Sequence, residues 1–153
     1  MKTRLLTTNL RIATNIQMKQ TDKELTHPEL SYKIVGAMFD VYNDLGYGYQ
    51  EKYYYRAIKQ SFKNRGLNFK EQFAIPLKFK DSRIGTYLLD FLVEDKIVVE
   101  IKKGDRFSRD NISQVVAYLK SANLKLGILV NFTSSGIKCK RILNLDSYIR
   151  NNS

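Results

Sequence analysis

The sequence has very few of the residues from which many metal sites and hydrolytic sites are built. Its 153 residues include one cysteine, Cys139, and one histidine, His27. A single cysteine excludes an internal disulfide and is compatible with a reducing compartment, so we expect a cytoplasmic, intracellular protein. The same scarcity excludes zinc sites made from clusters of histidine or cysteine. If the protein is a hydrolase, its base is therefore not expected to be a histidine.

Long hydrophobic runs are also absent. No apolar stretch approaches the roughly 20 residues that a membrane-spanning helix needs, so we expect no membrane association. Hydrophobic residues nevertheless make up 43% of the chain, which is enough for a sizeable core. A chain of this length suits one domain. The sequence therefore predicts a soluble globular domain.

Acidic residues are few in comparison with basic ones. The chain has 15 Asp and Glu against 26 Lys and Arg, a net charge of +11. This balance favours a polyanionic partner, above all nucleic acid, although a basic surface that only aids solubility is the alternative. The basic residues are scattered, which fits a groove assembled from several elements better than a tail. The candidates for contact with nucleic acid are Lys78, Lys80, Lys103, Arg106 and Arg109.

The two ends of the chain differ from its middle. Residues 1–25 are polar, basic and without hydrophobic periodicity, so we interpret them as a flexible leader. Because this leader has basic residues and no acidic one up to Thr21, organellar targeting stays open. We expect the folded domain at 26–145 and a C-terminal tail at 146–153.

Two amphipathic helices are expected at the start of the domain. Residues 26–29 have the T-x-x-E form of a capping box with Pro28 in the first turn, and apolar residues then recur at helical spacing as far as Leu45. A second helix is expected to end near Gly66, a natural C-terminal cap. Tyr53 is the tyrosine of this helix expected to be exposed. The inward stripe consists of Tyr54, Tyr55, Ile58 and Phe62.

From residue 67 onward the hydrophobic period becomes that of strands. We expect a hairpin with its turn at Asp81–Ser82, and Pro76 indicates an edge strand or a bulge. The remaining elements are expected at 96–102 (strand), 109–121 (helix), 124–132 (a central strand) and 136–143 (strand). The order α-α-β-β-β-α-β-β predicts an α/β fold, a sheet flanked by helices.

The hairpin and the strand after it carry polar residues where apolar side chains would pack better: Asp90, Glu100 and Lys102. Side chains alternate across a strand, so Glu100 and Lys102 share one face. If residues 94–96 form a three-residue turn, Asp90 lies opposite Glu100 and all three groups converge. A turn of two or four residues would put Asp90 on the other face.

Convergence of these groups would favour a metal site. Two carboxylates on a half-buried sheet face repel each other unless a divalent cation neutralises them. Mg²⁺ prefers a few carboxylates and several waters, which leaves positions for a phosphate, and a nearby lysine can orient or deprotonate an attacking water. The alternative is a solvated rim on which Glu100 and Lys102 form a surface pair.

Two further polar residues are candidates for the same region. Glu51 falls on the apolar stripe of the second helix and could face the sheet as a further acid, or it could simply favour the helix dipole. Gln114 and Tyr118 lie one turn apart on the later helix. They could hydrogen-bond toward the carboxylates or cover their edge.

Several segments resemble a known group of proteins. Asp90 followed by "EIK" at 100–102 resembles the D-x(n)-E-x-K signature of the PD-(D/E)xK nuclease superfamily. "GYQEKYY" at 48–54 matches the G-x-x-E-x-x-Y motif of the GxxExxY protein family, and "QVVAYLK" at 114–120 and "LKLGILVNF" at 124–132 are similar to its later helix and strand. The resemblance covers residues 29–144. It implies a restriction-endonuclease-like core, with a mixed central sheet flanked by helices.

The resemblance also implies roles for individual residues. Asp90 and Glu100 would bind Mg²⁺, for which Mn²⁺ can substitute, and Lys102 would be the catalytic lysine. The other implied members of the site are the carbonyl of Ile101 as a third metal ligand, Glu51 as a helical acid and metal-ligand candidate, and Gln114 as an accessory polar group. Leu89 departs from the signature, since a proline would precede the aspartate there.

These observations lead to three alternative functions. The first is a Mg²⁺-dependent nuclease that acts on DNA, with homodimerisation left open. The second is a nucleic-acid-binding module that retains the constellation without cleaving. The third is a protein-interaction domain in which tyrosines, of which the chain has ten with several in "YGYQEKYYY" at 47–55, form a contact surface.

Overall fold

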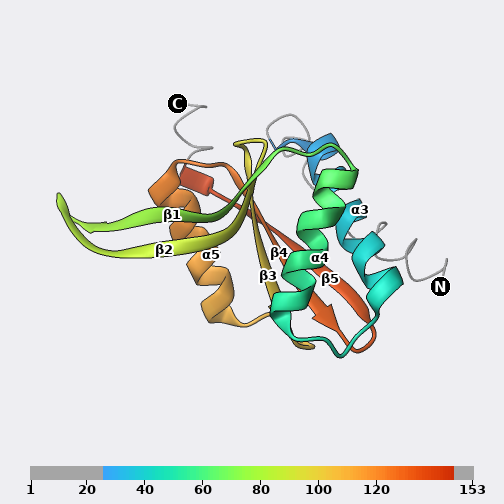
Figure 1. The fold of residues 1–153 in the computed structure, drawn as a ribbon. Coiled ribbons are helices and arrows are strands. Elements are labelled where there is room, and N and C mark those ends of the chain that lie inside the picture. The colour runs from blue at the N-terminus through green and yellow to red at the C-terminus, as the bar shows by residue number, and fades with distance from the viewer. Residues whose placement is uncertain (1–25, 147–153) are drawn as a thin grey trace.

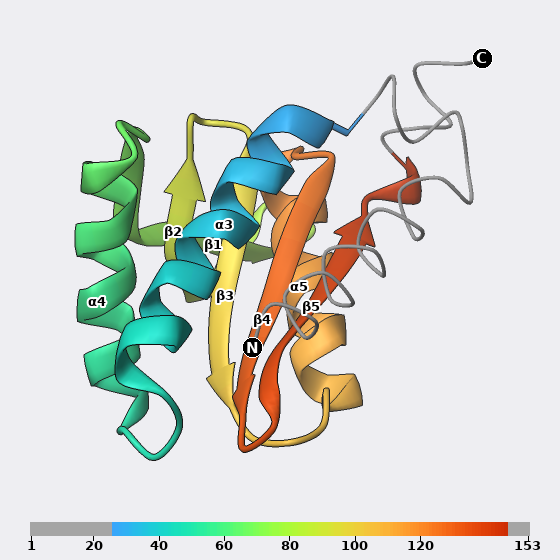
Figure 2. The same ribbon diagram turned by 90° about the vertical axis from the view of Figure 1, so that its right-hand side faces the viewer.

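The computed structural model of the protein describes residues 26–146 and shows a five-stranded sheet with helices on both faces (Figures 1 and 2). The elements in chain order are α3 (Pro28–Leu45), α4 (Glu51–Asn64), β1 (Phe69–Phe79), β2 (Ser82–Val93), β3 (Ile97–Lys103), α5 (Arg109–Ala122), β4 (Leu126–Thr133) and β5 (Gly136–Leu143). The predicted order of elements is confirmed. The predicted leader at 1–25 and all but the first residue of the predicted tail lie outside the described residues. None of the helices in 26–146 has the length and hydrophobicity needed to span a bilayer.

The sheet is mixed, as expected. Its strand order is β1-β2-β3-β4-β5, and neighbouring strands are antiparallel except for β3 and β4, which are parallel. Parallel neighbours need a crossover connection, and α5 supplies it. Every residue of β4 is buried, in agreement with the prediction of a central strand.

Helices α3 and α4 cover one face of the sheet, and α5 covers the other (Figure 2). Each face has its own hydrophobic core. On β3, Val99 and Ile101 belong to the core beneath α3 and α4, whereas Val98 belongs to the core beneath α5. Because side chains alternate along a strand, Glu100 and Lys102 are on the α5 face.

The predicted capping box at the start of α3 is wrong. The N-cap residue is His27, in a left-handed conformation with φ 49°, and it makes no side-chain cap hydrogen bond. Thr26 is buried, and its hydroxyl instead accepts a hydrogen bond from the guanidinium of Arg141. This long-range contact with β5 replaces the local cap that the pattern predicted.

The predicted end of α4 is confirmed. Gly66 has φ 69°, and its amide donates to the carbonyl of Lys63. The amide of Leu67 donates to the carbonyl of Phe62, five residues earlier. Glycine adopts this left-handed conformation without a steric penalty, which is why the helix ends here.

The β1–β2 hairpin reaches beyond the rest of the sheet (Figure 1). Only residues 91–93 of β2 pair with β3, so the outer part of the hairpin is a two-stranded ribbon. Its turn is at Lys80–Asp81, one residue earlier than predicted. Pro76 lies on the edge strand β1, and the register shifts between Leu77 and Lys78, which confirms the predicted edge and bulge.

Candidate active site

The turn between β2 and β3 has the length that brings the candidate residues together. Val93 pairs with Ile97 and Phe91 pairs with Val99, so residues 94–96 form a three-residue turn. The amide of Lys96 closes this turn by donating to the carbonyl of Val93. The predicted odd-length turn is confirmed.

Beyond Phe91 the two strands separate, and the carboxylates of Asp90 and Glu100 occupy the fork. The backbone amide of Asp90 donates to Oε1 of Glu100 at 2.8 Å. The backbone amide of Ile101 donates to Oδ2 of Asp90, also at 2.8 Å. Each carboxylate therefore binds a backbone amide of the opposite strand, at the point where the backbone ladder between β2 and β3 has ended.

The edge strand also changes conformation at this point. The pairing of β1 with β2 includes Glu71 with Phe91 and Phe73 with Leu89, but it omits Gln72 and Asp90 between them. Gln72 has φ 49°, a left-handed conformation that residues other than glycine rarely adopt. Backbone conformations of this kind concentrate at functional sites, where the surrounding structure maintains them.

Asp90 and Glu100 are two neighbouring acids with no cationic side chain in direct contact among the described residues. Glu100 is only 5% exposed, and burial, with a further contribution from the nearby Asp90, raises its pKa to about 8. Burial also raises the pKa of Asp90, while the hydrogen bond from Ile101 and the charge of Lys102 oppose this. Among residues 26–146, no ion pair within 4.0 Å includes either carboxylate. The alternative of a surface pair between Glu100 and Lys102 is therefore wrong.

A pocket of about 250 Å³ opens between the start of α4 and the fork. Its lining consists of Glu51, Lys52, Tyr55, Gln72, Asp90 and Ile101. Glu51 is exposed rather than on the buried stripe, because it is the first residue of α4 and the buried positions of this helix begin at Tyr54. It nevertheless lines the same pocket as Asp90. In the part of the chain that the structure describes, no three side chains of Asp, Glu, His or Cys gather closely enough to hold a metal by themselves.

The tyrosine of the G-x-x-E-x-x-Y segment, Tyr54, fixes the loop that precedes α4. Its hydroxyl donates to the carbonyl of Gly46 at 2.6 Å and accepts from the amide of Tyr49 at 3.4 Å. Its ring is fully buried and stacks on Phe132 with centroids 4.2 Å apart. Tyr54 thereby anchors the start of the helix that carries Glu51 to the central part of the sheet.

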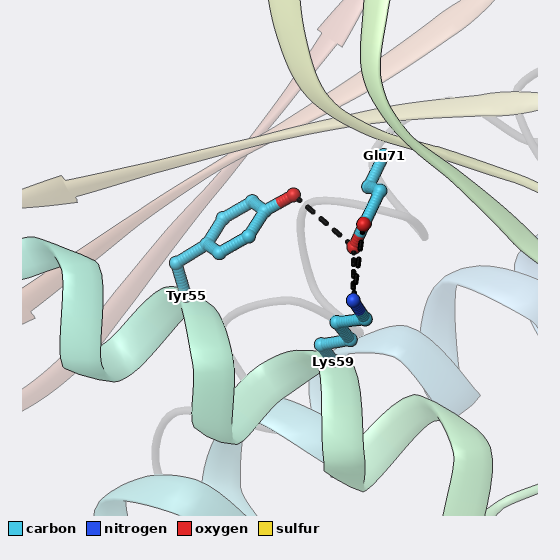
Figure 3. Close-up of polar contacts among 3 residues, drawn as sticks. All are labelled: Tyr55, Lys59 and Glu71. Atoms are coloured by element: carbon cyan, nitrogen blue, oxygen red, sulfur yellow. Dashed lines mark hydrogen bonds and ion pairs between the residues drawn. The ribbon is translucent and has the colours of Figure 1, made fainter.

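Tyr55 forms one wall of the pocket. Its ring stacks on Phe91 at 4.7 Å, and its hydroxyl donates to Oε2 of Glu71 at 3.4 Å. Figure 3 shows that Lys59 approaches the same carboxylate from the next turn of α4, with its Nζ 2.9 Å from Oε2. Burial raises the pKa of the Tyr55 hydroxyl above its ordinary value. The sequence placed Tyr55 in the inward stripe but gave no signal that it borders a pocket.

On the other face of the sheet, α5 places Tyr118 rather than Gln114 close to the carboxylates. Tyr118 is buried, and burial followed by the charge of Glu100 raises its pKa to about 12. Its ring packs edge to face against that of Tyr87 in the hairpin, with the ring centroids 4.5 Å apart. Gln114 is exposed one turn earlier, and among the hydrogen bonds of residues 26–146 none joins it to Asp90 or Glu100.

The five basic candidates for contact with nucleic acid form two separate groups. All five are exposed. Lys103 ends β3, and Arg106 and Arg109 follow it into the start of α5, whereas Lys78 and Lys80 are at the outer end of the β1–β2 ribbon. Figure 1 shows that this outer end is far from the start of α5.

Comparison with solved structures found ten matching chains, two of which are 18% identical to this protein. SSO0001 has a TM-score of 0.48, with 67% of this chain and 59% of that chain covered. The alkaline exonuclease LHK-Exo from Laribacter hongkongensis has a TM-score of 0.47, with 65% of this chain and 58% of that chain covered. The protein thus spans less than two thirds of the length of these two chains.

Comparison with curated proteins found no match. The narrower assignment to the GxxExxY family stays a prediction. Residues 28–142, more than half of the chain, match the family described as the PD-(D/E)XK nuclease superfamily. The chain therefore belongs to the PD-(D/E)XK nuclease superfamily.

Proposed function

We propose that the protein is a Mg²⁺-dependent nuclease that hydrolyses phosphodiester bonds in DNA, and that Mn²⁺ can substitute for Mg²⁺. The observation that carries the proposal is the pair of carboxylates at the fork, a buried Glu100 beside a half-buried Asp90, with no ion-pair partner within 4.0 Å among the described residues. When two carboxylates are neighbours, their repulsion favours protonation of one of them unless a cation is present. A hard divalent ion would keep both groups ionised.

The donor set fits such an ion. The backbone hydrogen bonds engage one oxygen of Asp90 and one of Glu100, which leaves the second oxygen of each for a metal. The carbonyl of Ile101 would be a third ligand, and Glu51 would contribute from across the pocket. Mg²⁺ usually takes one or two carboxylates and retains waters, so the absence of a third acid in direct contact is consistent with this ion.

Lys102 would act on the water that attacks the phosphate. It shares the face of β3 with Glu100 and is half-buried, and its charge partly opposes the rise that burial causes in the pKa of both carboxylates. In this position its amine can orient or deprotonate the water and balance charge on the phosphate. When bound, the metal supplies Lewis acidity and neutralises phosphate charge.

The basic surface supports a polyanionic substrate. Lys103 is the last residue of the strand that carries Glu100 and Lys102, Arg106 is in the loop after this strand and Arg109 is the first residue of α5, so phosphates that flank the reacting one would meet them. The ribbon residues Lys78 and Lys80 offer a second contact further away. Affinity of this kind depends on salt and little on base sequence.

Cleavage of plasmid and of end-labelled linear DNA tests the proposal. We expect nicking or shortening with Mg²⁺ or Mn²⁺, none with chelator, and none for the Asp90→Asn and Glu100→Gln variants in either metal. DNA binding without cleavage by the wild-type protein in both metals would contradict the proposal and favour the non-cleaving module.

A further inference from the structure

Three exposed tyrosines surround the start of α4 beside the pocket. Tyr47 and Tyr49 are in the loop before this helix and Tyr53 is in its first turn, with exposed fractions of 44%, 44% and 43%. By contrast, the ring of Tyr54, the residue after Tyr53, faces inward and is fully buried. We call Tyr47, Tyr49 and Tyr53 the tyrosine rim. The packing of the domain does not account for its exposed ring surface.

Basic side chains accompany two of the three rings. Nζ of Lys103 is 5.3 Å from the ring centroid of Tyr47. Nζ of Lys52 is 5.1 Å from the centroid of Tyr53, and the guanidinium carbon of Arg56 is 5.7 Å from it. Cations at this distance interact with aromatic faces and remain available to anions. The rim therefore presents flat apolar surfaces together with positive charge.

Two lysines, Lys52 on α4 and Lys103 on β3, connect the tyrosine rim to the candidate active site. Lys52, which contacts the ring of Tyr53, also lines the pocket that contains Asp90. Lys103, which contacts the ring of Tyr47, directly follows Lys102 on β3. A ligand whose phosphate occupies the pocket would therefore have its neighbouring groups at the rim.

We propose that the tyrosine rim binds unpaired bases of a DNA strand whose phosphate occupies the pocket, so that the substrate is single-stranded DNA or a single-stranded segment at a duplex end. Aromatic rings interleaved with cations bind single strands because every unpaired base offers a face for stacking, while the cations follow the phosphates. In an intact duplex these faces are covered by the neighbouring base pairs. The inference deepens the proposed function and rests on it for the identity of the polymer.

The sequence itself supplies a sensitive reporter for this binding. The chain has no tryptophan, so a Tyr53→Trp variant contains a single tryptophan, located at the rim. In chelator, where no cleavage occurs, titration with oligothymidine should quench its fluorescence to saturation. The matched control is Tyr32→Trp, because Tyr32 is 64% exposed on α3 and interacts electrostatically with Arg65 at the opposite end of α4. We expect no quenching for this control.

Alanine substitutions separate stacking from general electrostatic attraction. Tyr47→Ala and Tyr53→Ala should each weaken binding of oligothymidine by roughly ten-fold. Binding of a blunt duplex of the same length should change by less than about two-fold, since phosphate contacts dominate it. Both residues are exposed, and thermal unfolding of the variants checks that the fold is intact. The inference is overturned if the alanine variants bind the single strand with unchanged affinity, or if they lose affinity for single strand and duplex equally. It is also overturned if the fluorescence of Tyr32→Trp is quenched as much as that of Tyr53→Trp.

The outcome also distinguishes failure of the inference from failure of the proposed function. If the wild-type protein cleaves DNA with Mg²⁺ but the rim variants bind and cleave single strands normally, the inference fails and the proposed function stands. If the Tyr53→Trp variant shows saturable quenching but the wild-type protein cleaves nothing in Mg²⁺ or Mn²⁺, the rim is confirmed as a single-strand site and the proposed function fails. Binding of a protein partner with no affinity for oligothymidine would overturn the inference.

Discussion

Asp90 and Glu100 face each other at the fork between β2 and β3, where the amide of Asp90 donates to the carboxylate of Glu100. Asp90 in turn accepts from the amide of Ile101, the residue after Glu100. The two acids therefore satisfy backbone donors that the separating strands would otherwise leave unpaired. This arrangement fixes both carboxylates in place, but it also holds the buried Glu100 beside a second, half-buried acid. The site thus costs stability in the absence of a cation, and that cost can be measured.

Replacing Glu100 with glutamine should stabilise the metal-free protein. Its folded-state pKa of about 8 is above the ordinary value of 4.5, so between these pH values the folded state binds more protons than the unfolded state. Stability from this group is therefore lost as pH rises through that window. Glutamine stays neutral and retains an oxygen for the amide of Asp90. In chelator, we expect Glu100→Gln to raise Tm by several °C, on the order of 1 kcal/mol or more, at pH 8 and by less at pH 5.

The control for this experiment is Glu29→Gln, which alters an exposed acid in the first turn of α3. Substitutions at such surface positions usually change stability by about 0.5 kcal/mol or less. If Glu100→Gln lowered Tm at pH 8, or if its effect were the same at both pH values, the two carboxylates would not repel each other as the structure indicates.

Divalent ions should stabilise the wild-type protein. A ligand at about 100 times its Kd adds about 2.7 kcal/mol to the free energy of unfolding when it binds only the folded state. We expect a rise in Tm with millimolar Mg²⁺ or Mn²⁺, and none in the Asp90→Asn or Glu100→Gln variants. Asp44→Asn, an exposed change on α3, should leave the metal-induced rise intact. A rise of equal size in Asp90→Asn would show that the ions bind elsewhere.

Lys102→Ala should remove cleavage while leaving DNA affinity nearly intact. The residue is half-buried beside the carboxylates, so it is placed to act on the attacking water rather than to attract the polymer. We expect a loss of at least about a hundred-fold in single-turnover cleavage and a change in Kd of less than about three-fold. Lys33→Ala, an exposed lysine on α3, should alter neither quantity. Equal losses of binding and cleavage in Lys102→Ala would assign the lysine to substrate attraction instead.

The sequence was informative about the strands of the site because strand geometry is local. Alternation along a strand requires Glu100 and Lys102 to share a face, and an odd-length turn requires Asp90 to lie opposite Glu100. Both statements follow from counting residues, and the register confirms the turn on which the second depends. The bulge near Pro76 was predictable for the same reason, since proline cannot donate to a ladder.

The parts of the site that the sequence did not reveal depend on tertiary packing. Glu51 has the spacing of the buried stripe of α4. Whether the first turn of this helix is buried, however, depends on how far the sheet extends beneath it, which the sequence of the helix does not encode. The left-handed conformation of Gln72 has no sequence signal, because a glutamine in a strand predicts an extended backbone. Thr26 matches a capping box, but Arg141, 115 positions away, takes its hydroxyl. No local pattern contains these contacts.

Tyr54→Phe tests whether the buried hydroxyl positions the acid of α4. The variant retains the ring that stacks on Phe132 but loses the donor to the carbonyl of Gly46, which would be left without this partner. Loss of one such bond costs about 1 kcal/mol, a decrease in Tm of roughly 2–4 °C for a chain of this size. Because the same bond fixes the loop before Glu51, we also expect slower cleavage at saturating DNA. Tyr32→Phe removes an exposed hydroxyl and should change neither Tm nor cleavage. If Tyr54→Phe has a lower Tm but cleaves at the wild-type rate, the hydroxyl of Tyr54 stabilises the fold and does not position Glu51 for cleavage.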